Sequence, residues 1–198
     1  MTEHLTDEDM EALVVVAERS VWEMVAHHRR WRPAADLHSS ALRAPGAAFV
    51  SLHRDGRLAG CIGVLSTGEP LVVTVADRAS AAAVNDPRFR PVDPLDLPRL
   101  DVEVSVLTPS VPLRVESYAE LLSTVGPGVD GITVHAGRHR ATMLPTVWND
   151  LIAPADFIAA VWRKAGLTPG DWPRGIEVER YRTQTRGHSG HGVHAPTD

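Results

Sequence analysis

The feature of this sequence that most constrains the fold is a predicted β-hairpin over residues 48–64, AFVSLHRDGRLAGCIGV. Two apolar-rich runs flank Asp55-Gly56, a pair that is typical of a two-residue type I′ turn. A tight turn at this pair places Cys61 opposite Val50. Because side chains alternate along a strand, Ala59 and Cys61 would then share one face. The full predicted register joins Arg54 with Arg57, Leu52 with Ala59, and Val50 with Cys61.

Periodicity predicts helices and further strands around this hairpin. Apolar residues at helical spacing follow Thr6, which can cap a first helix that ends near residues 27–30. Residues 100–107, LDVEVSVL, alternate strictly and predict a strand with one apolar face. The polar residues of this strand fall on its other face: Asp101, Glu103 and Ser105. The other predicted elements are helices over residues 71–86, 118–125 and 155–165, a second hairpin over 131–144, and a final strand over 175–183.

This order of elements predicts an α+β protein, a single domain over residues 1–186 with a largely antiparallel sheet and packed helices. From Gly187 onward the chain is rich in glycine and histidine and offers no core residues. We therefore expect a disordered tail over residues 187–198. Three histidines of the tail could bind a transition metal adventitiously, and no function is assigned to them: His188, His191 and His194.

Composition and charge exclude several classes of function. The 198-residue chain has 20 Lys and Arg against 25 Asp and Glu, a formal net charge of −5, so neither nucleic acid nor an anionic membrane is an expected partner. The single cysteine, Cys61, forms no internal disulfide, and the ligand spacings of zinc and iron–sulfur sites do not occur. We therefore expect no metal and no cofactor. The N-terminus is acidic and no apolar run approaches about 18 residues, which predicts a cytoplasmic protein without a membrane span.

Six ordered motifs resemble those of the AMMECR-one domain family. The resemblance covers about residues 10–182, and it implies an α+β fold with a cleft near the cysteine. For prokaryotic members it also implies association with a radical-SAM protein and a Memo-type, dioxygenase-like protein, but it does not bring a settled reaction. The family patterns LRGCIG, D-x-R-F, EVSVL, PGxDG, LPxVW and KAGL are matched by residues 60–63, 86–89, 103–107, 127–131, 144–148 and 164–167.

One position departs from the family pattern. The arginine of LRGCIG is Ala59 in this chain. On the predicted register this position neighbours Cys61 on the same strand face, where a guanidinium would favour the thiolate. The departure therefore weakens the expectation of thiol chemistry in this member.

Cys61 and Glu103 are candidate catalytic residues, and each has a structural alternative. A free cysteine is commonly a small buried side chain, here one that packs against Val50. As a nucleophile it needs a base within reach. Glu103 belongs to a family motif and points away from the apolar face of its strand. Together with Asp101 and Ser105 it forms either a solvated polar face or the wall of a partly dry cleft, where a carboxylate can take or give a proton.

Two histidines and two possible ligand-binding residues complete the candidates. His135 and His139 flank the turn of the second hairpin and are catalytic candidates, although histidines beside such turns are commonly just exposed. Ser105, on the face of Glu103, is a candidate substrate-binding residue. Arg88 either binds a carboxylate or phosphate of the substrate, or locks its own loop by pairing with a neighbouring aspartate, Asp86 or Asp93.

Two hypotheses of function follow. The first is an enzyme with a small-molecule cleft near Cys61 and Glu103 that uses carboxylate acid/base chemistry, and possible thiol chemistry, for example in a condensation of specialised metabolism. The second is a non-catalytic adaptor for radical-SAM and Memo-like proteins. A shielded Glu103 would favour the enzyme, and an open Glu103 beside a large apolar patch would favour the adaptor.

Overall fold

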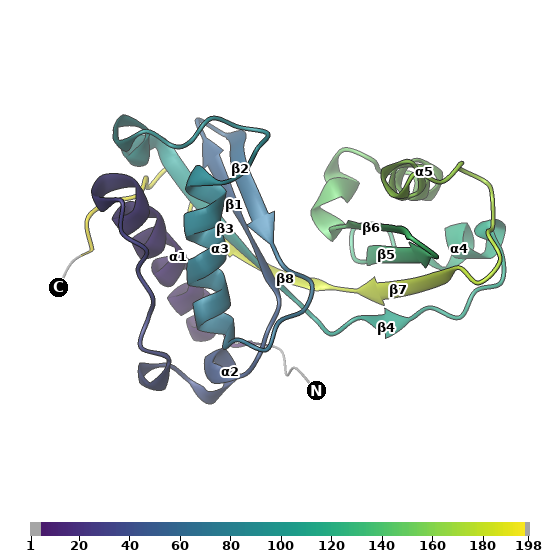
Figure 1. Cartoon of the computed structure of the whole chain (residues 1–198), viewed down its shortest axis with the longest axis horizontal. Coiled ribbons are helices and arrows are strands. Elements are labelled where there is room, and N and C mark those ends of the chain that lie inside the picture. The colour runs from purple at the N-terminus through teal and green to yellow at the C-terminus, as the bar shows by residue number, and fades with distance from the viewer. Residues whose placement is uncertain (1–4, 197–198) are drawn as a thin grey trace. The chain divides into compact units, whose positions relative to one another are not determined.

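A computed structural model describes residues 5–196, and the chain forms two compact units. Unit 1 combines residues 1–107 with residues 184–198, and unit 2 spans residues 108–183. Each unit has its own four-stranded sheet, whose strands are labelled in Figure 1. Each unit also has its own hydrophobic core. The predicted α+β class with antiparallel pairing is confirmed, whereas one domain over residues 1–186 stays a prediction.

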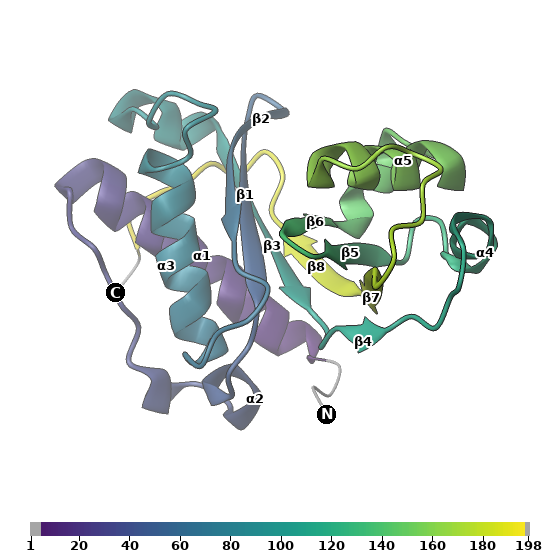
Figure 2. The ribbon, with the colours of Figure 1, turned by 45° about the vertical axis from the view of Figure 1, so that its right-hand side comes forward.

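Unit 1 is a sheet with helices on one side (Figure 2). Its strand order is β2-β1-β3-β8. The first helix begins as predicted, because the Thr6 hydroxyl accepts a hydrogen bond from the Asp9 N–H at 3.1 Å in a capping box. The elements of this unit are α1 (Asp7–His27), η1 (Ala35–Leu37), α2 (Ser40–Arg43), β1 (Ala48–Arg54), β2 (Arg57–Gly63), α3 (Leu71–Val84), η2 (Pro94–Arg99), β3 (Leu100–Leu107) and β8 (Thr183–Gly187).

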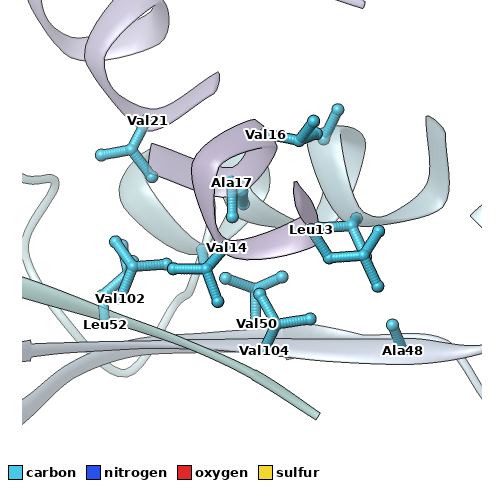
Figure 3. Close-up of a cluster of buried hydrophobic side chains, with 14 of the residues drawn as sticks. Leu13, Val14, Val16, Ala17, Val21, Ala48, Val50, Leu52, Val102 and Val104 are labelled. Atoms are coloured by element: carbon cyan, nitrogen blue, oxygen red, sulfur yellow. The ribbon is translucent and has the colours of Figure 1, made fainter. Parts of the chain in front are cut away.

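The core of unit 1 lies between its two long helices, α1 and α3, and one face of the sheet, which we call the inner face (Figure 3). Val14 of α1, Val50 of β1 and Val102 of β3 are each at most 1% exposed. Burying a valine side chain contributes about 1.5–3 kcal/mol, so these contacts hold the helices to the sheet. The alternation predicted for β3 is confirmed, since Val102 is buried while Asp101 and Glu103 are only partly buried on the opposite, outer face.

The hairpin of β1 and β2 forms with the predicted turn but with a different register. Asp55 and Gly56 have φ angles of 51° and 74°, the left-handed values that a type I′ turn requires. A β-bulge then shifts the pairing, so that Cys61 lies opposite Ser51 and not opposite Val50. The prediction that Cys61 shares a face with Val50 is therefore wrong.

The bulge has a physical cause at Ala59 and Gly60. Gly60 lies so close to α3 that a Cβ there would collide with the carbonyl oxygen of Ala82, so only glycine admits the helix at this point. The extra residue reverses the alternation along β2. Ala59 stays on the core-facing side, where the regular register would also place it, and is 8% exposed. Cys61 turns to the outer face beside Ser51. Ala59 has no ladder partner, since the pairs on either side join Leu52 with Gly60 and His53 with Leu58.

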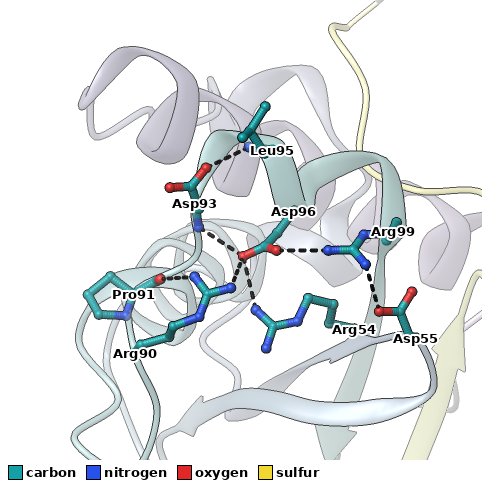
Figure 4. A network of polar contacts seen from close by, with 8 residues as sticks. All are labelled: Arg54, Asp55, Arg90, Pro91, Asp93, Leu95, Asp96 and Arg99. Carbon is teal, nitrogen blue, oxygen red and sulfur yellow. Dashed lines mark hydrogen bonds and ion pairs between the residues drawn. The ribbon is translucent and has the colours of Figure 1, made fainter.

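A buried carboxylate ties the hairpin to η2 (Figure 4). The side chain of Asp96 is 4% exposed, and its Oδ2 accepts hydrogen bonds from Arg54 Nη1 at 2.9 Å and Arg90 Nη2 at 2.8 Å. Its Oδ1 accepts one from Arg99 Nη2 at 3.3 Å. Burial alone would raise the pKa of Asp96, but the N–H of Asp93 and the guanidinium of Arg54 outweigh it and hold this pKa below its usual value.

The segment that follows β8 packs on unit 1. The expectation of a tail without core residues is wrong, because Val193 is 2% exposed and belongs to the core of unit 1. Its N–H donates to the Leu97 carbonyl at 2.8 Å, and the N–H of His188 donates to the Val102 carbonyl at 3.3 Å. A single valine among glycines and histidines carries no periodic pattern, which is why the sequence gives no sign of this contact. Residues 197–198 of the predicted tail lie outside the described residues.

Unit 2 is a second antiparallel sheet covered by a helix. Its strand order is β4-β7-β5-β6. The predicted second hairpin and final strand are confirmed, although the final strand continues into β8, which pairs in the sheet of unit 1. The elements are β4 (Val111–Pro112), α4 (Tyr118–Thr124), β5 (Gly131–Ala136), β6 (His139–Met143), η3 (Pro145–Asn149), α5 (Pro154–Ala165) and β7 (Glu177–Tyr181).

The core of unit 2 gathers under α5. Phe157, Val161 and Trp162 of this helix are fully buried, as the helical spacing predicts, and the ring of Trp148 stacks on Phe157 at 3.9 Å. The helix ends at Gly166, whose φ of 76° is the predicted left-handed cap. Across residues 5–196 no helix has both the length and the apolar content for crossing a membrane.

Candidate functional site

Three side chains form a row on the outer face of the sheet of unit 1: Cys61 of β2, Ser51 of β1 and Glu103 of β3. Ser51 is the cross-strand partner of both other residues, and its hydroxyl donates a hydrogen bond to Cys61 Sγ at 3.3 Å. Neighbouring strands are about 4.8 Å apart, so the backbones at Cys61 and Glu103 are about 10 Å apart. Within the described part of the chain no hydrogen bond joins Glu103 to Cys61, and Ser51 stands between them.

Two side chains of the loop after α3 hold the backbone of Cys61. Its N–H donates to Asp86 Oδ2 at 2.8 Å, and its carbonyl accepts from Arg88 Nη2 at 2.9 Å. The guanidinium of Arg88 is also paired with the Asp86 carboxylate at 2.7 Å, which holds the pKa of Asp86 well below its usual range and raises that of Arg88. The loop-locking interpretation of Arg88 thus describes its contacts, and substrate binding by this residue stays a prediction.

The structure shows where the side chain at position 59 lies, the position at which the family pattern has arginine and this chain has Ala59. Position 59 faces the core of unit 1 and not the side chain of Cys61. The expectation that an arginine at this position would neighbour the thiol is therefore wrong for this chain, because it rested on a register without the bulge. Arg88 brings a guanidinium to Cys61 from a different segment.

A pocket with a volume of about 190 Å³ opens beside Glu103 within unit 1. No lysine or arginine lines it. The Glu103 carboxylate is partly buried and forms no hydrogen bond or ion pair with any other residue of the described chain, whereas Asp101 Oδ1 accepts the N–H of Gly190 at 2.7 Å. The lining residues come from β1, the hairpin turn, β3, the end of β8 and the segment after it: His53, Gly56, Asp101, Val102, Glu103, Gly187, His188 and Ser189.

The other predicted site residues are placed as follows. Ser105 is 4% exposed, and its hydroxyl is hydrogen-bonded to that of Thr185 at 2.9 Å, so it lies outside the pocket lining. His135 and His139 belong to unit 2, whereas Cys61 and Glu103 belong to unit 1.

Both histidines of unit 2 have partners in their own unit. His135 Nε2 lies 3.8 Å from Glu179 Oε2. His139 Nδ1 is 2.9 Å from the Ala165 carbonyl, a partner at the C-terminus of α5 that a protonated ring nitrogen satisfies. A catalytic role of either histidine stays a prediction, as does a substrate-binding role of Ser105.

Sequence reasoning missed Ser51 as the residue between Cys61 and Glu103. A signal for it existed, because an isolated glycine inside a strand pattern, here Gly60, indicates a bulge. Ser189 was missed because it lies in the segment that was expected to be disordered. Among residues 5–196, no group of three or more His, Cys, Asp or Glu side chains is arranged to hold a metal ion.

Comparisons with known proteins agree with the motifs. The AMMECR1 family model matches residues 14–186. A protein of Methanothermobacter thermautotrophicus is 39% identical over 183 residues, which cover 92% of this chain and 94% of that protein. A protein of Aeropyrum pernix is 39% identical over 191 residues, covering 91% of this chain and 79% of that protein. The crystal structure of an uncharacterized protein from Pyrococcus horikoshii matches with a TM-score of 0.86 at 30% identity, covering 97% of this chain and 96% of that chain. The chain belongs to the AMMECR1 family.

Proposed function

We propose that unit 1 binds a small polar molecule in the pocket beside Glu103, and that Glu103 acts on it as a general acid or base. The observation that carries this proposal is the Glu103 carboxylate, which is partly buried in a pocket and has no partner among the described residues. A carboxylate in that setting loses hydration without gaining a protein hydrogen bond. It is therefore available to a ligand that donates to it or exchanges a proton with it.

The charge of the lining favours a ligand that carries an amine. Asp101 and Glu103 are successive outer-face residues of β3, and their negative charges meet no lysine or arginine in the lining. His53 is the cross-strand partner of Asp101 and lines the same pocket, where its imidazole offers a further hydrogen-bonding group to a ligand. An ammonium group offers three donors, enough to contact both carboxylates.

Cys61 gives the same face a second reactive group. A molecule that extends from the pocket across β1 would pass Ser51 and reach the thiol about 10 Å away. This arrangement suits a condensation, in which Glu103 takes the proton from a carbon next to a carbonyl group and later returns a proton to the product. Cys61 would line the far end of that site, or add reversibly to a carbonyl carbon there, in which case the C=O π bond breaks and the carbonyl oxygen takes up the thiol proton.

Proton transfer can be tested without knowledge of the natural reaction. We expect the protein in D₂O to accelerate deuterium incorporation into aminoacetone, a small cationic ketone, more than into neutral hydroxyacetone or anionic pyruvate. General acid/base groups contribute about 10²- to 10⁴-fold, so Glu103→Gln should remove an effect of that size. Mass spectrometry of the three compounds measures the exchange.

The matched control is Glu177→Gln, which alters an exposed glutamate on β7 of unit 2 and should leave exchange unchanged. Cys61→Ser tests the thiol separately. If Glu103→Gln exchanges all three compounds at the wild-type rate, Glu103 is not the acid/base group. That result would favour the adaptor hypothesis, in which this face holds a radical-SAM or Memo-like protein partner.

A further inference from the structure

One wall of the pocket is made by the last residue of β8 and the segment that follows it. Gly187, His188 and Ser189 line the pocket, and the segment is fixed to β3 on both sides of Ser189. The N–H of His188 donates to the Val102 carbonyl at 3.3 Å, and the N–H of Gly190 donates to Asp101 Oδ1 at 2.7 Å. We call residues 187–190 the pocket wall.

The imidazole of His188 joins this wall to α1. Its Nε2 lies 2.7 Å from Glu11 Oε1, and its Nδ1 lies 2.9 Å from Glu18 Oε1. Glu11 and Glu18 are seven residues apart, about two helical turns, so they lie on one face of α1. The ring therefore bridges two carboxylates of the helix.

The protonation state of His188 follows from these contacts. A neutral imidazole has one N–H and one lone pair, whereas the imidazolium ion has two N–H donors. A carboxylate is only an acceptor. Both short contacts are therefore favourable hydrogen bonds only when the ring carries its second proton.

We propose that His188, Glu11 and Glu18 form a latch that holds the pocket wall closed while His188 is protonated and releases it when His188 loses a proton. After deprotonation one ring nitrogen presents its lone pair to a carboxylate, and that contact becomes repulsive. The wall then keeps one ring hydrogen bond to α1, the bonds of His188 N–H to the Val102 carbonyl and of Gly190 N–H to the Asp101 carboxylate, and the packing of Val193. The consequence for ligand access rests on the proposed function, but the movement of the wall does not.

The charges around His188 favour its protonated form. Burial alone would lower the pKa of His188, but its hydrogen bonds to Glu18 and Glu11 outweigh burial and raise the pKa above its ordinary value. From β8, Arg186 Nε donates to Glu11 Oε2 at 2.7 Å and its Nη1 lies 3.6 Å from Asp7.

Glu11 and several other titratable groups also surround His188. Arg186 first, and then His188, lowers the pKa of Glu11, so this carboxylate is charged throughout the range in which His188 titrates. Within the segment, the ring of His191 lies 5.6 Å from that of His188. From β3, the carboxylate of Asp101 binds the wall through Gly190, and His53 of β1 lines the same pocket.

The test is amide hydrogen exchange across pH 6 to 9 on the full chain, with protection factors corrected for the intrinsic pH dependence. We expect protection of the His188 and Gly190 amides to fall about tenfold as His188 deprotonates, the size expected when one hydrogen bond to a charged group is lost. Core amides, such as that of Val102, should keep their protection. A ring titration of His188 by NMR should give the same midpoint.

Three variants separate the latch from general loosening of the segment. His188→Gln should make the protection of Gly190 independent of pH, and Glu18→Gln should reduce the change and move its midpoint down. His194→Gln, which alters an exposed histidine of the same segment, should behave as the wild type. A wall with equal protection at pH 6 and pH 9, or a wild-type pH dependence in His188→Gln, would overturn the proposal. Aminoacetone exchange measured at pH 6 and pH 9 separates the latch from the proposed acid/base role of Glu103. If the wall opens with pH but no exchange depends on Glu103, the latch is supported and the proposed function is contradicted.

Discussion

At the scale of single residues, Asp86 does most to fix the position of Cys61. Its carboxylate, with a side chain only 3% exposed, accepts the N–H of Cys61 at the free edge of β2 and the side chain of Arg88 from its own loop. An edge strand presents unpaired backbone groups. Here the N–H and the carbonyl of Cys61 are hydrogen-bonded to the side chains of Asp86 and Arg88. Two charged side chains from the loop after α3 thus hold the backbone of Cys61.

We predict that Asp86→Asn loosens this end of β2. The substitution keeps the shape but removes the charge, so the hydrogen bonds to Arg88 and Cys61 weaken, and the free energy of unfolding should fall by about 2 kcal/mol. Urea denaturation measures that loss, and native-state alkylation by iodoacetamide should become several-fold faster at Cys61. Asp36→Asn, at an exposed residue of η1, is the control. Unchanged alkylation together with unchanged stability would show that Asp86 does not hold this strand.

At the scale of elements, the bulge in β2 decides which side chains meet on the outer face. Without it Cys61 would lie opposite Val50 and point into the core, and the row of Cys61, Ser51 and Glu103 would not form. The bulge exists where α3 approaches the strand most closely, at the backbone of Ala82. The position of α3 and the row of Cys61, Ser51 and Glu103 are therefore linked through Gly60.

Gly60→Ala tests this link. The added methyl group would meet the Ala82 carbonyl, so either α3 or β2 must shift, and we expect the free energy of unfolding to fall by about 2–3 kcal/mol. Gly68→Ala is the matched control, because a Cβ there meets no atom within 4 Å. Chemical denaturation of both variants gives the comparison. Equal stabilities would mean that the close approach does not depend on glycine.

The bulge also marks the limit of what the sequence could predict. The turn at Asp55-Gly56, the cap at Thr6 and the alternation of β3 depend on residues that are close in sequence, and these predictions are confirmed. The register at Cys61 depends on α3, about 20 residues away, and the pocket wall depends on α1 at the other end of the chain. The alternation of β3 was enough to predict that Glu103 points away from the apolar face. The pocket beside it could not be predicted, because its lining comes from segments that are far apart in the sequence.

At the scale of the whole molecule, the two units differ in how charge supports them. Four carboxyl groups of unit 1 have a pKa below their usual values, each because of identifiable partners. Hydrogen bonds from Ser39, Arg186 and Arg88 lower the pKa of Asp9, Glu11 and Asp86, in that order. Burial would raise the pKa of Asp96, but Asp93 and Arg54 keep it below its usual value. Unit 2 is organised instead around the aromatic core of Trp148, Phe157 and Trp162.

This difference predicts that acid unfolds unit 1 before unit 2. A carboxyl group whose pKa is lower in the folded state stabilises the fold at pH values above its unfolded pKa of about 4, and that stability is lost as pH falls through the folded value. Between pH 5 and pH 2 we therefore expect the indole NMR signals of Trp22 and Trp31 in unit 1 to lose their native positions before those of Trp148 and Trp162. Asp86→Asn should reduce the acid dependence of unit 1, because it removes one titrating group. Simultaneous loss of all four signals, or earlier loss from unit 2, would mean that these carboxylates do not determine acid stability.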